Sequence, residues 1–226
     1  KDFDVALGAG AVANGYMYYG SQVSAIAIGN DAQAIGGGFI AIGDGATATS
    51  ENVDRLKIGN IAIGEGAKAT GSSGNIAIGY KAEASSGQGN AFGIESQATG
   101  ASSSAFGWQA WATANDATAI GVMSRATALR STAIGPYAQA TANYTTSLGY
   151  FARATDVKNI SVGGYSEARG SGSIALGYEA DAYGNYSLAI GTEAVSGLGK
   201  SEDGKWVSSA GYTLSVGNYA KARGDQ

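Results

Sequence analysis

The stretch NIAIGYKAEASSG at 75–87 contains the pattern on which the whole chain is built. A small residue, an apolar residue and a glycine stand together at Ala77, Ile78 and Gly79, and alanines alternate with other residues at Ala82 and Ala84. Such period-two alternation is typical of β-strands. Close variants occur as STAIGPYAQATAN at 131–143 and GSIALGYEADAYG at 172–184. The sequence therefore predicts a repeat protein with short strands.

The glycine of this pattern returns every 14 residues from Gly79 to Gly191. Counting the more widely spaced copies, the repeat glycines are Gly8, Gly29, Gly43, Gly64, Gly79, Gly93, Gly107, Gly121, Gly135, Gly149, Gly163, Gly177, Gly191 and Gly217. The wider spacings indicate loop insertions near 14–22, 50–58 and 197–210.

Positions in each repeat are numbered here from its glycine, which is position 0. Position −1 is always Ile, Leu, Val or Phe, position −2 is Ala or Ser, and positions +3 and +5 are almost always Ala. Each repeat is predicted to form two short strands and two turns, and strands of successive coils pair in parallel about 4.8 Å apart. We expect positions −1, +3 and +5 to line the interior and position −2 to face outward. The predicted fold is an all-β solenoid of about fourteen coils over residues 1–226.

The composition limits the possible functions. The chain has 37 glycines, one proline, no cysteine and no histidine, with a formal charge of −4. There is no Gly-X-Y period of collagen, no basic surface for nucleic acid, no apolar run long enough for a membrane helix, and no thiol chemistry. We expect a fragment of a longer protein, because Lys1 begins within the pattern.

The predicted interior is thin, which favours association between chains. One large apolar residue and a few alanine methyl groups per coil stabilise little against the entropy of ordering fourteen residues. The small residues at position −2, from Ala6 to Ser215, would permit close approach of another chain. The sequence predicts assembly about a common axis, but the number of chains does not follow from it.

The repeats at 75–87, 131–143 and 172–184 resemble the YadA-like head repeat of trimeric autotransporter adhesins. The resemblance implies a left-handed parallel β-roll, a homotrimer, and display on the outer membrane of a Gram-negative bacterium. It also implies multivalent attachment to host extracellular-matrix proteins, cell-surface receptors or other surfaces. In that family a separate stalk and a membrane anchor connect the head to the membrane, and no heptad pattern of such a stalk is present in this sequence.

Aromatic residues near the repeat glycines are the candidate ligand-binding groups, because aromatic side chains in an exposed line often bind proteins or glycans. They are Trp108, Trp111, Tyr137, Tyr150, Phe151, Tyr165 and Tyr178, together with Tyr16, Tyr18 and Tyr19 of the first insertion. The alternative is that these rings stack on one another or pack against a neighbouring chain.

We predict no catalytic residues, no cofactor and no metal site. Without His or Cys, acid–base chemistry would depend on Asp and Glu. Residues such as Glu65, Glu83, Glu95 and Glu179 occupy turns or polar positions typical of a solvated face. The RGD triplet at 223–225 and the nucleotide-loop-like AVSGLGKS at 194–201 are motifs of low specificity. The first is better explained as part of the last repeat, and the second as a surface insertion.

Two other functions fit the repeat. A phage tail-fibre or tailspike segment would also be trimeric and rich in β-structure. An ice-binding solenoid would use a row of hydroxyl groups, and position +6 carries one at Thr49, Thr70, Ser85, Thr99, Thr113, Thr127, Thr141 and Thr155. Position +4 provides no matching second threonine row, and a β-branched residue on a solvated strand also explains the first.

Overall fold

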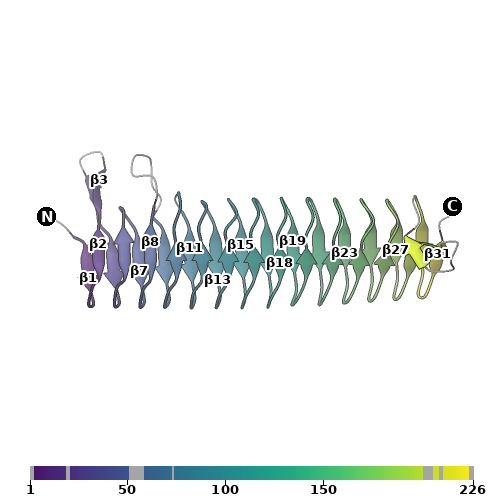
Figure 1. The fold of residues 1–226 in the computed structure, drawn as a ribbon, viewed down its shortest axis with the longest axis horizontal. Helices are drawn as coiled ribbons and strands as arrows, with labels where there is room; N and C mark the ends of the chain where they lie inside the picture. Colours follow the sequence, from purple (N-terminus) through teal and green to yellow (C-terminus); the bar gives the residue numbers. More distant parts are fainter. Residues whose placement is uncertain are drawn as a thin grey trace. The chain divides into compact units, whose positions relative to one another are not determined.

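The computed structural model describes residues 3–18, 21–50, 59–72, 74–200, 206–208 and 211–223. These residues form a parallel β-solenoid without helices, divided into unit 1 (Lys1–Asp116) and unit 2 (Ala117–Gln226). In each unit the strands that end just before the repeat glycines form sheet A, and the strands that follow the glycines form sheet B (Figure 1). No helix suited to crossing a membrane occurs among the described residues.

The strands of unit 1 follow one another in both sheets with parallel pairing. Sheet A contains β1 (Val5–Leu7), β5 (Ile26–Ile28), β7 (Ile40–Ile42), β9 (Ile61–Ile63), β11 (Ile76–Ile78), β13 (Asn90–Phe92) and β15 (Ser104–Phe106). Sheet B contains β2 (Val12–Asn14), β6 (Gln33–Ile35), β8 (Thr47–Thr49), β10 (Lys68–Ala69), β12 (Glu83–Ala84), β14 (Gln97–Ala98) and β16 (Trp111–Ala112).

Unit 2 repeats this arrangement. Sheet A contains β17 (Thr118–Ile120), β19 (Thr132–Ile134), β21 (Thr146–Leu148), β23 (Ile160–Val162), β25 (Ile174–Leu176), β27 (Leu188–Ile190) and β30 (Leu214–Val216). Sheet B contains β18 (Arg125–Ala126), β20 (Gln139–Ala140), β22 (Arg153–Ala154), β24 (Glu167–Ala168), β26 (Asp181–Ala182), β28 (Val195–Lys200) and β31 (Lys221–Arg223), with β29 (Trp206–Ser208) paired antiparallel to β28.

Equivalent positions of successive repeats lie directly opposite one another. In β11 and β13, Ala77 pairs with Ala91 and Ile78 pairs with Phe92. A one-residue slip would turn every side chain to the wrong face, so the strict sequence period fixes this register. The 14-residue spacing is therefore the length of one winding of the chain.

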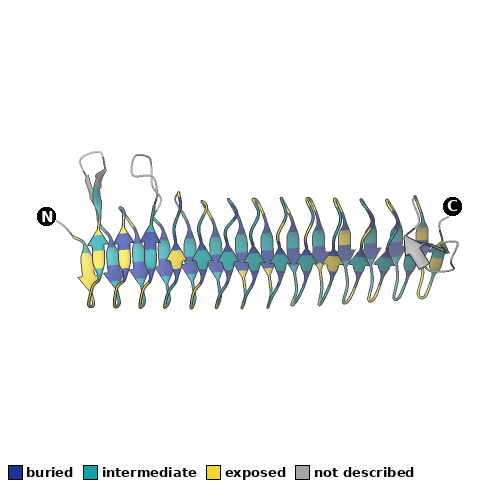
Figure 2. Cartoon of the chain, viewed as in Figure 1, coloured by how far each residue is buried: buried dark blue, intermediate teal, exposed yellow. Residues whose placement is uncertain are grey.

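The interior is lined by positions −4, −2, +3 and +5, all of which carry mostly small residues. In one repeat these are Asn75, Ala77, Ala82 and Ala84, each fully buried. Figure 2 shows the resulting bands of buried residues along the strands. Two facing strands joined by tight turns leave space for little more than methyl, hydroxyl and amide groups, except at Phe39 in position −4, whose ring is fully buried against Gly36.

The expected orientation of positions −1 and −2 was wrong. Ala77 at position −2 is buried, whereas Ile78 at position −1 is only partly covered and faces outward. An isoleucine does not fit the narrow interior, and alternation along the strand then turns the neighbouring alanine inward. The proposed small-residue contact surface at position −2 therefore does not exist. The outward face of sheet A carries Ile, Leu, Val and Phe instead.

Several buried polar residues complete the interior through hydrogen bonds to the main chain. The Asn75 side-chain amide donates to the Thr70 carbonyl at 2.7 Å, and its oxygen accepts from the Gly89 N–H at 3.0 Å. Asn159 makes the same kind of bonds to Ala168 and Ser173. These contacts satisfy polar main-chain groups inside the coil.

The first insertion contains an antiparallel hairpin of β3 (Tyr16–Tyr18) and β4 (Ser21–Val23). At its base, the Asp4 carboxylate accepts hydrogen bonds from the Gly15 N–H at 2.9 Å and the Ala25 N–H at 2.7 Å. Residues 51–58 of the second insertion and residues 201–205 and 209–210 of the third lie outside the described residues.

Candidate functional site

Two rows of side chains project outward beside sheet B, at positions +2 and +4 of each repeat. Position +2 lies in the turn after the repeat glycine and adopts the left-handed conformation, with φ of 59° at Tyr137, 54° at Phe151 and 56° at Tyr165. The turn is held to the previous coil, because the Tyr165 N–H donates to the Tyr150 carbonyl at 2.8 Å. Side chains at position +2 are therefore presented from an ordered main chain.

In unit 2 these turns carry an aromatic ladder, defined here as Tyr137, Tyr150, Phe151, Tyr165 and Tyr178. Tyr137 and Phe151 stack with ring centroids 4.6 Å apart, and Phe151 stacks on Tyr165 at 5.6 Å. Tyr150 meets the edges of this stack, 5.3 Å from Tyr165, and Tyr178 lies 6.0 Å from Tyr165. Five of the residues predicted to bind a ligand therefore lie together. They also stack on one another, which agrees with the alternative interpretation of these rings.

The ladder remains open to solvent. Tyr150, Tyr165 and Tyr178 are each exposed by close to half of their surface. Burial and hydrogen bonding with Tyr165 raise the pKa of Tyr150 above its ordinary 10.0, so Tyr150 presents a neutral hydroxyl group. The ladder is an apolar surface edged by hydrogen-bonding groups, which suits contact with another macromolecule.

The other predicted aromatic residues do not join the ladder. Trp108 is exposed in unit 1, and Trp111 is half-buried on β16. Tyr16 is half-buried at the base of the hairpin, against Gly37. Tyr18 lies in β3, but its side chain and the whole of Tyr19 lie outside the described residues.

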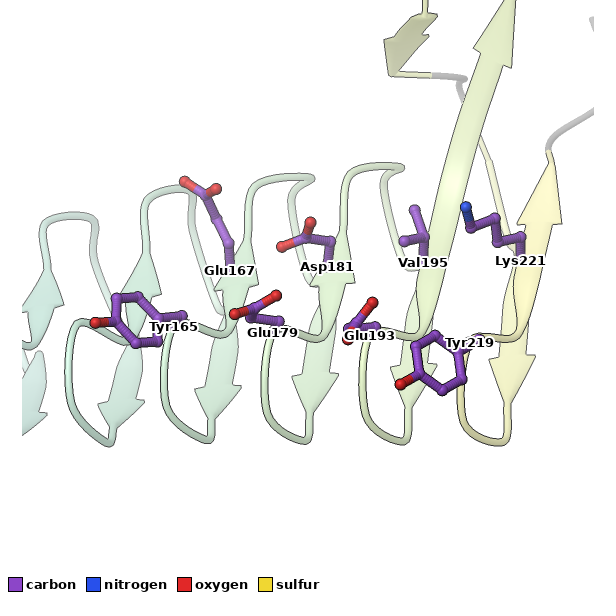
Figure 3. A pocket seen from close by; sticks show the side chains of 8 residues that line it. All are labelled: Tyr165, Glu167, Glu179, Asp181, Glu193, Val195, Tyr219 and Lys221. Carbon is purple, nitrogen blue, oxygen red and sulfur yellow. The ribbon is translucent and has the colours of Figure 1, made fainter.

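An acidic groove of about 450 Å³ begins at Tyr165 and follows both rows toward β31. Its walls are Tyr165, Glu179, Glu193 and Tyr219 at position +2, and Glu167, Asp181, Val195 and Lys221 at position +4. Figure 3 shows the two rows side by side, with one residue of each row from each coil. Tyr165 belongs both to the ladder and to the groove.

The charge of the groove is poorly balanced. Glu167 contacts Arg153 at 3.4 Å and Arg169 at 2.6 Å. Glu179, Asp181 and Glu193 form no salt bridge within the described part of the chain. The groove therefore combines three carboxylates that form no salt bridge with one lysine, Lys221, at its far end.

Asp181 is the least solvated of these acids. Burial raises its pKa from 3.8 to about 6, and the nearby negative charge of Glu167 adds to the effect. The Tyr183 hydroxyl donates a hydrogen bond to Asp181 at 3.0 Å, which opposes the rise. In turn, burial and the Asp181 carboxylate raise the pKa of Tyr183 to about 12. Asp181 and Tyr183 therefore form a hydrogen-bonded pair at the groove, in which the negative charge of the Asp181 carboxylate is only partly stabilised.

This groove is not among the sites predicted from the sequence. Glu179 was interpreted as part of a solvated face, and Asp181 and Glu193 were not singled out. The signal was present, because acidic residues recur at positions +2 and +4 of successive repeats, and equal positions lie in adjacent coils. Their meaning depends on the two rows being neighbours in space, which the repeat period alone does not reveal.

Two short motifs from the sequence gain no structural support. The stretch 194–201 lies largely in strand β28, and no helix follows it within the described residues. Arg223 ends β31, and the other residues of the 223–225 triplet lie outside the described residues. No group of three acidic side chains in the described residues is arranged to hold a metal ion.

Comparison with protein families matches the model described as YadA head domain repeat (2 copies), at residues 91–110, 98–124, 126–152 and 168–194. The chain contains a YadA-like head domain. The matched segments of this YadA-like head include most of the aromatic ladder and the acidic residues Glu179, Asp181 and Glu193. Among curated proteins, no sequence matches the chain.

Proposed function

We propose that this YadA-like head is the extracellular, adhesive part of a trimeric autotransporter on a Gram-negative outer membrane. In this proposal three chains, each a left-handed roll, intertwine and attach to extracellular-matrix proteins or cell-surface receptors of a host, or to other surfaces. The observation that carries the proposal is the repeated match to the YadA head model over both sheets of the solenoid.

The outward face of sheet A supports self-association. In each unit its positions −3 and −1 are largely apolar, as at Ile76 and Ile78 in unit 1 and Ile174 and Leu176 in unit 2. Phe92 and Phe106 stack on this face at 4.9 Å. A continuous row of partly exposed aliphatic and aromatic side chains is costly in water and gains from burial against another chain. A second and third copy of the same chain present the same apolar face.

The aromatic ladder supports the adhesive role. It lies in the turns that join sheet A to sheet B, outside the strands of the proposed interface on sheet A, so we expect assembly to leave it accessible. Three copies per particle convert weak single contacts into avid attachment. A binding role, not catalysis, is the function that this surface fits.

The assembly is tested by measuring the mass of the purified head with light scattering after size-exclusion chromatography. We expect three chains for the native sequence, and smaller species for Ile78→Asp and Ile134→Asp, which place a charge on the face of sheet A. Gln139→Asp, on the outward face of sheet B, is the matched control and should leave the mass unchanged. A monomeric native head would contradict the proposed assembly.

The adhesive role is tested by binding the head to immobilised matrix proteins, with Tyr150→Ala and Trp108→Ala as variants. Tyr150 is part of the ladder and Trp108 is not, so loss of binding in the first variant alone assigns attachment to the ladder. Absence of binding to every matrix protein and cell surface in the panel would overturn this part of the proposal.

A further inference from the structure

The aromatic ladder and the acidic groove are one continuous surface. Tyr165 contacts Phe151 and Tyr178 of the ladder and also forms the first wall of the groove. Tyr178 adds a second connection, because hydrogen bonding to the neighbouring Glu179 carboxylate raises its pKa. A ligand on the ladder therefore also lies within reach of the carboxylates.

This surface is set into an ordered frame. The Glu179 N–H donates to the Gly164 carbonyl at 2.9 Å, and the Glu193 N–H donates to the Tyr178 carbonyl at 2.8 Å. Both residues adopt the same left-handed conformation as Tyr165. The main-chain positions from which the carboxylates project are thus set before any ligand arrives, which reduces the entropy lost on binding.

The chemistry of the surface selects for positive charge. Tyrosine rings attract ammonium and guanidinium groups through the electron-rich faces and hydroxyl oxygens that they expose. Carboxylates without a salt-bridge partner attract the same groups, and a concave wall concentrates that attraction. Tyr165 and Tyr219 stand at the two ends of the position +2 row, with Glu179 and Glu193 between them.

We propose that the ladder and groove together bind a basic, extended segment of a partner protein. This inference rests on the proposed adhesive function and specifies the chemistry of its target. Arginine or lysine side chains of the segment enter the groove beside Glu179, Asp181 and Glu193, and its apolar parts cover Tyr150 and Tyr165. The groove crosses four coils, roughly 14 Å at 4.8 Å per coil, which is the length of four or five extended residues.

The same charges exclude the other large classes of ligand. Sulfated glycans and nucleic acids carry dense negative charge and are repelled by the three carboxylates that form no salt bridge. A divalent metal ion requires several oxygen ligands converging on one point, and no such group occurs among the described residues. A chain with spaced positive charges matches the distribution of acids along the groove.

The test uses a fluorescein-labelled peptide of alternating arginine and serine, titrated with the purified head and followed by fluorescence anisotropy. The variant Glu179→Gln with Glu193→Gln should bind about tenfold more weakly, as expected for the loss of two charge contacts. Glutamine is compatible with this turn, because Gln109 occupies the same position with φ of 51°. Tyr165→Ala should also weaken binding, whereas Tyr165→Phe should keep most of it.

The matched control is Glu65→Gln with Glu83→Gln, which removes the same charge from unit 1 outside the groove. Equal weakening in this control would mean that only net charge matters and would overturn the proposal, as would native binding by the groove variant. A peptide of alternating glutamate and serine should not bind.

If the head fails to bind any matrix protein but still binds the basic peptide through the groove, the adhesive function fails and this inference stands. If matrix binding persists in the groove variant, this inference fails alone.

Discussion

A Cβ atom added to Gly121 would lie 2.7 Å from the carbonyl carbon and oxygen of Gly135 in the next coil. Gly121 also has φ of +124°, a main-chain conformation that residues other than glycine rarely adopt. The glycine at position 0 is therefore required twice, by conformation and by the close approach of successive windings.

The strained conformation alone should cost Gly121→Ala about 1–3 kcal/mol of stability. The total loss should be larger, because the main chain must also move. Gly45→Ala is the control. Gly45 has φ of +62°, but an added Cβ would meet nothing within 4 Å. Chemical denaturation measures the free energy of unfolding of both variants. Equal losses of stability would show that the close approach of successive coils does not exclude a side chain at position 0.

The buried amide of Asn75 supports a second prediction. Asn75→Ala leaves the Gly89 N–H and the Thr70 carbonyl inside the coil without partners, which should cost about 1–3 kcal/mol of unfolding free energy. Asn90→Ala on the outward face of sheet A removes the same type of side-chain amide from an accessible position, and it should lower the free energy of unfolding much less. Both free energies follow from urea denaturation. A loss from Asn90→Ala as large as that from Asn75→Ala would contradict the structural role of the buried amide.

The sequence was sufficient to predict the strands, the turns and the role of the glycines, because the period of 14 residues and the alternation along each strand are purely local signals. It was not sufficient to orient the strands. Ala77 and Ile78 are both apolar, and alternation states only that they face opposite ways. The useful cue was size: Ala82 and Ala84 were already expected inside, and a layer of alanines has no space for Ile78.

The candidate site was predictable only in part. Tyr137, Phe151 and Tyr165 stand at one position of successive repeats, so their stacking follows from the period. The groove requires a further fact, namely that positions +2 and +4 are neighbours across a turn with left-handed geometry. The pKa of Asp181 depends on its burial, which raises it, and on Glu167, Tyr183 and Arg169, of which Glu167 raises it and the other two lower it.

Asp181 gives a prediction for pH dependence. Because its pKa is raised from 3.8 to about 6 in the folded chain, its contribution to stability is complete below pH 3.8 and is lost as the pH rises through 6. A shift of this size corresponds to about 3 kcal/mol, which solvent screening of a partly open carboxyl reduces to about 1 kcal/mol.

Asp181→Asn should therefore unfold at higher denaturant concentration than the native chain at pH 7, and the gain should vanish near pH 4. Carbon NMR titration of the Asp181 carboxyl measures the pKa directly. Tyr183→Phe should raise that pKa further, because the hydrogen bond from the Tyr183 hydroxyl favours the charged form. An unchanged pKa in Tyr183→Phe would exclude the hydrogen bond as a determinant.

Asp4 provides the last prediction, on the first insertion. Its two carboxylate oxygens accept separate hydrogen bonds from Gly15 and Ala25, the residues on either side of the β3–β4 hairpin. The Asp4 side chain thus holds both ends of the hairpin against the first coil. Asp4→Ala should accelerate amide hydrogen exchange at Gly15 and Ala25 by about tenfold, since charge-assisted bonds contribute about 1.5 kcal/mol or more each. Asp44→Ala, in a turn of the same unit, is the control for loss of charge. Protection that persists at both amides in Asp4→Ala would mean that strand pairing alone holds the base of the hairpin.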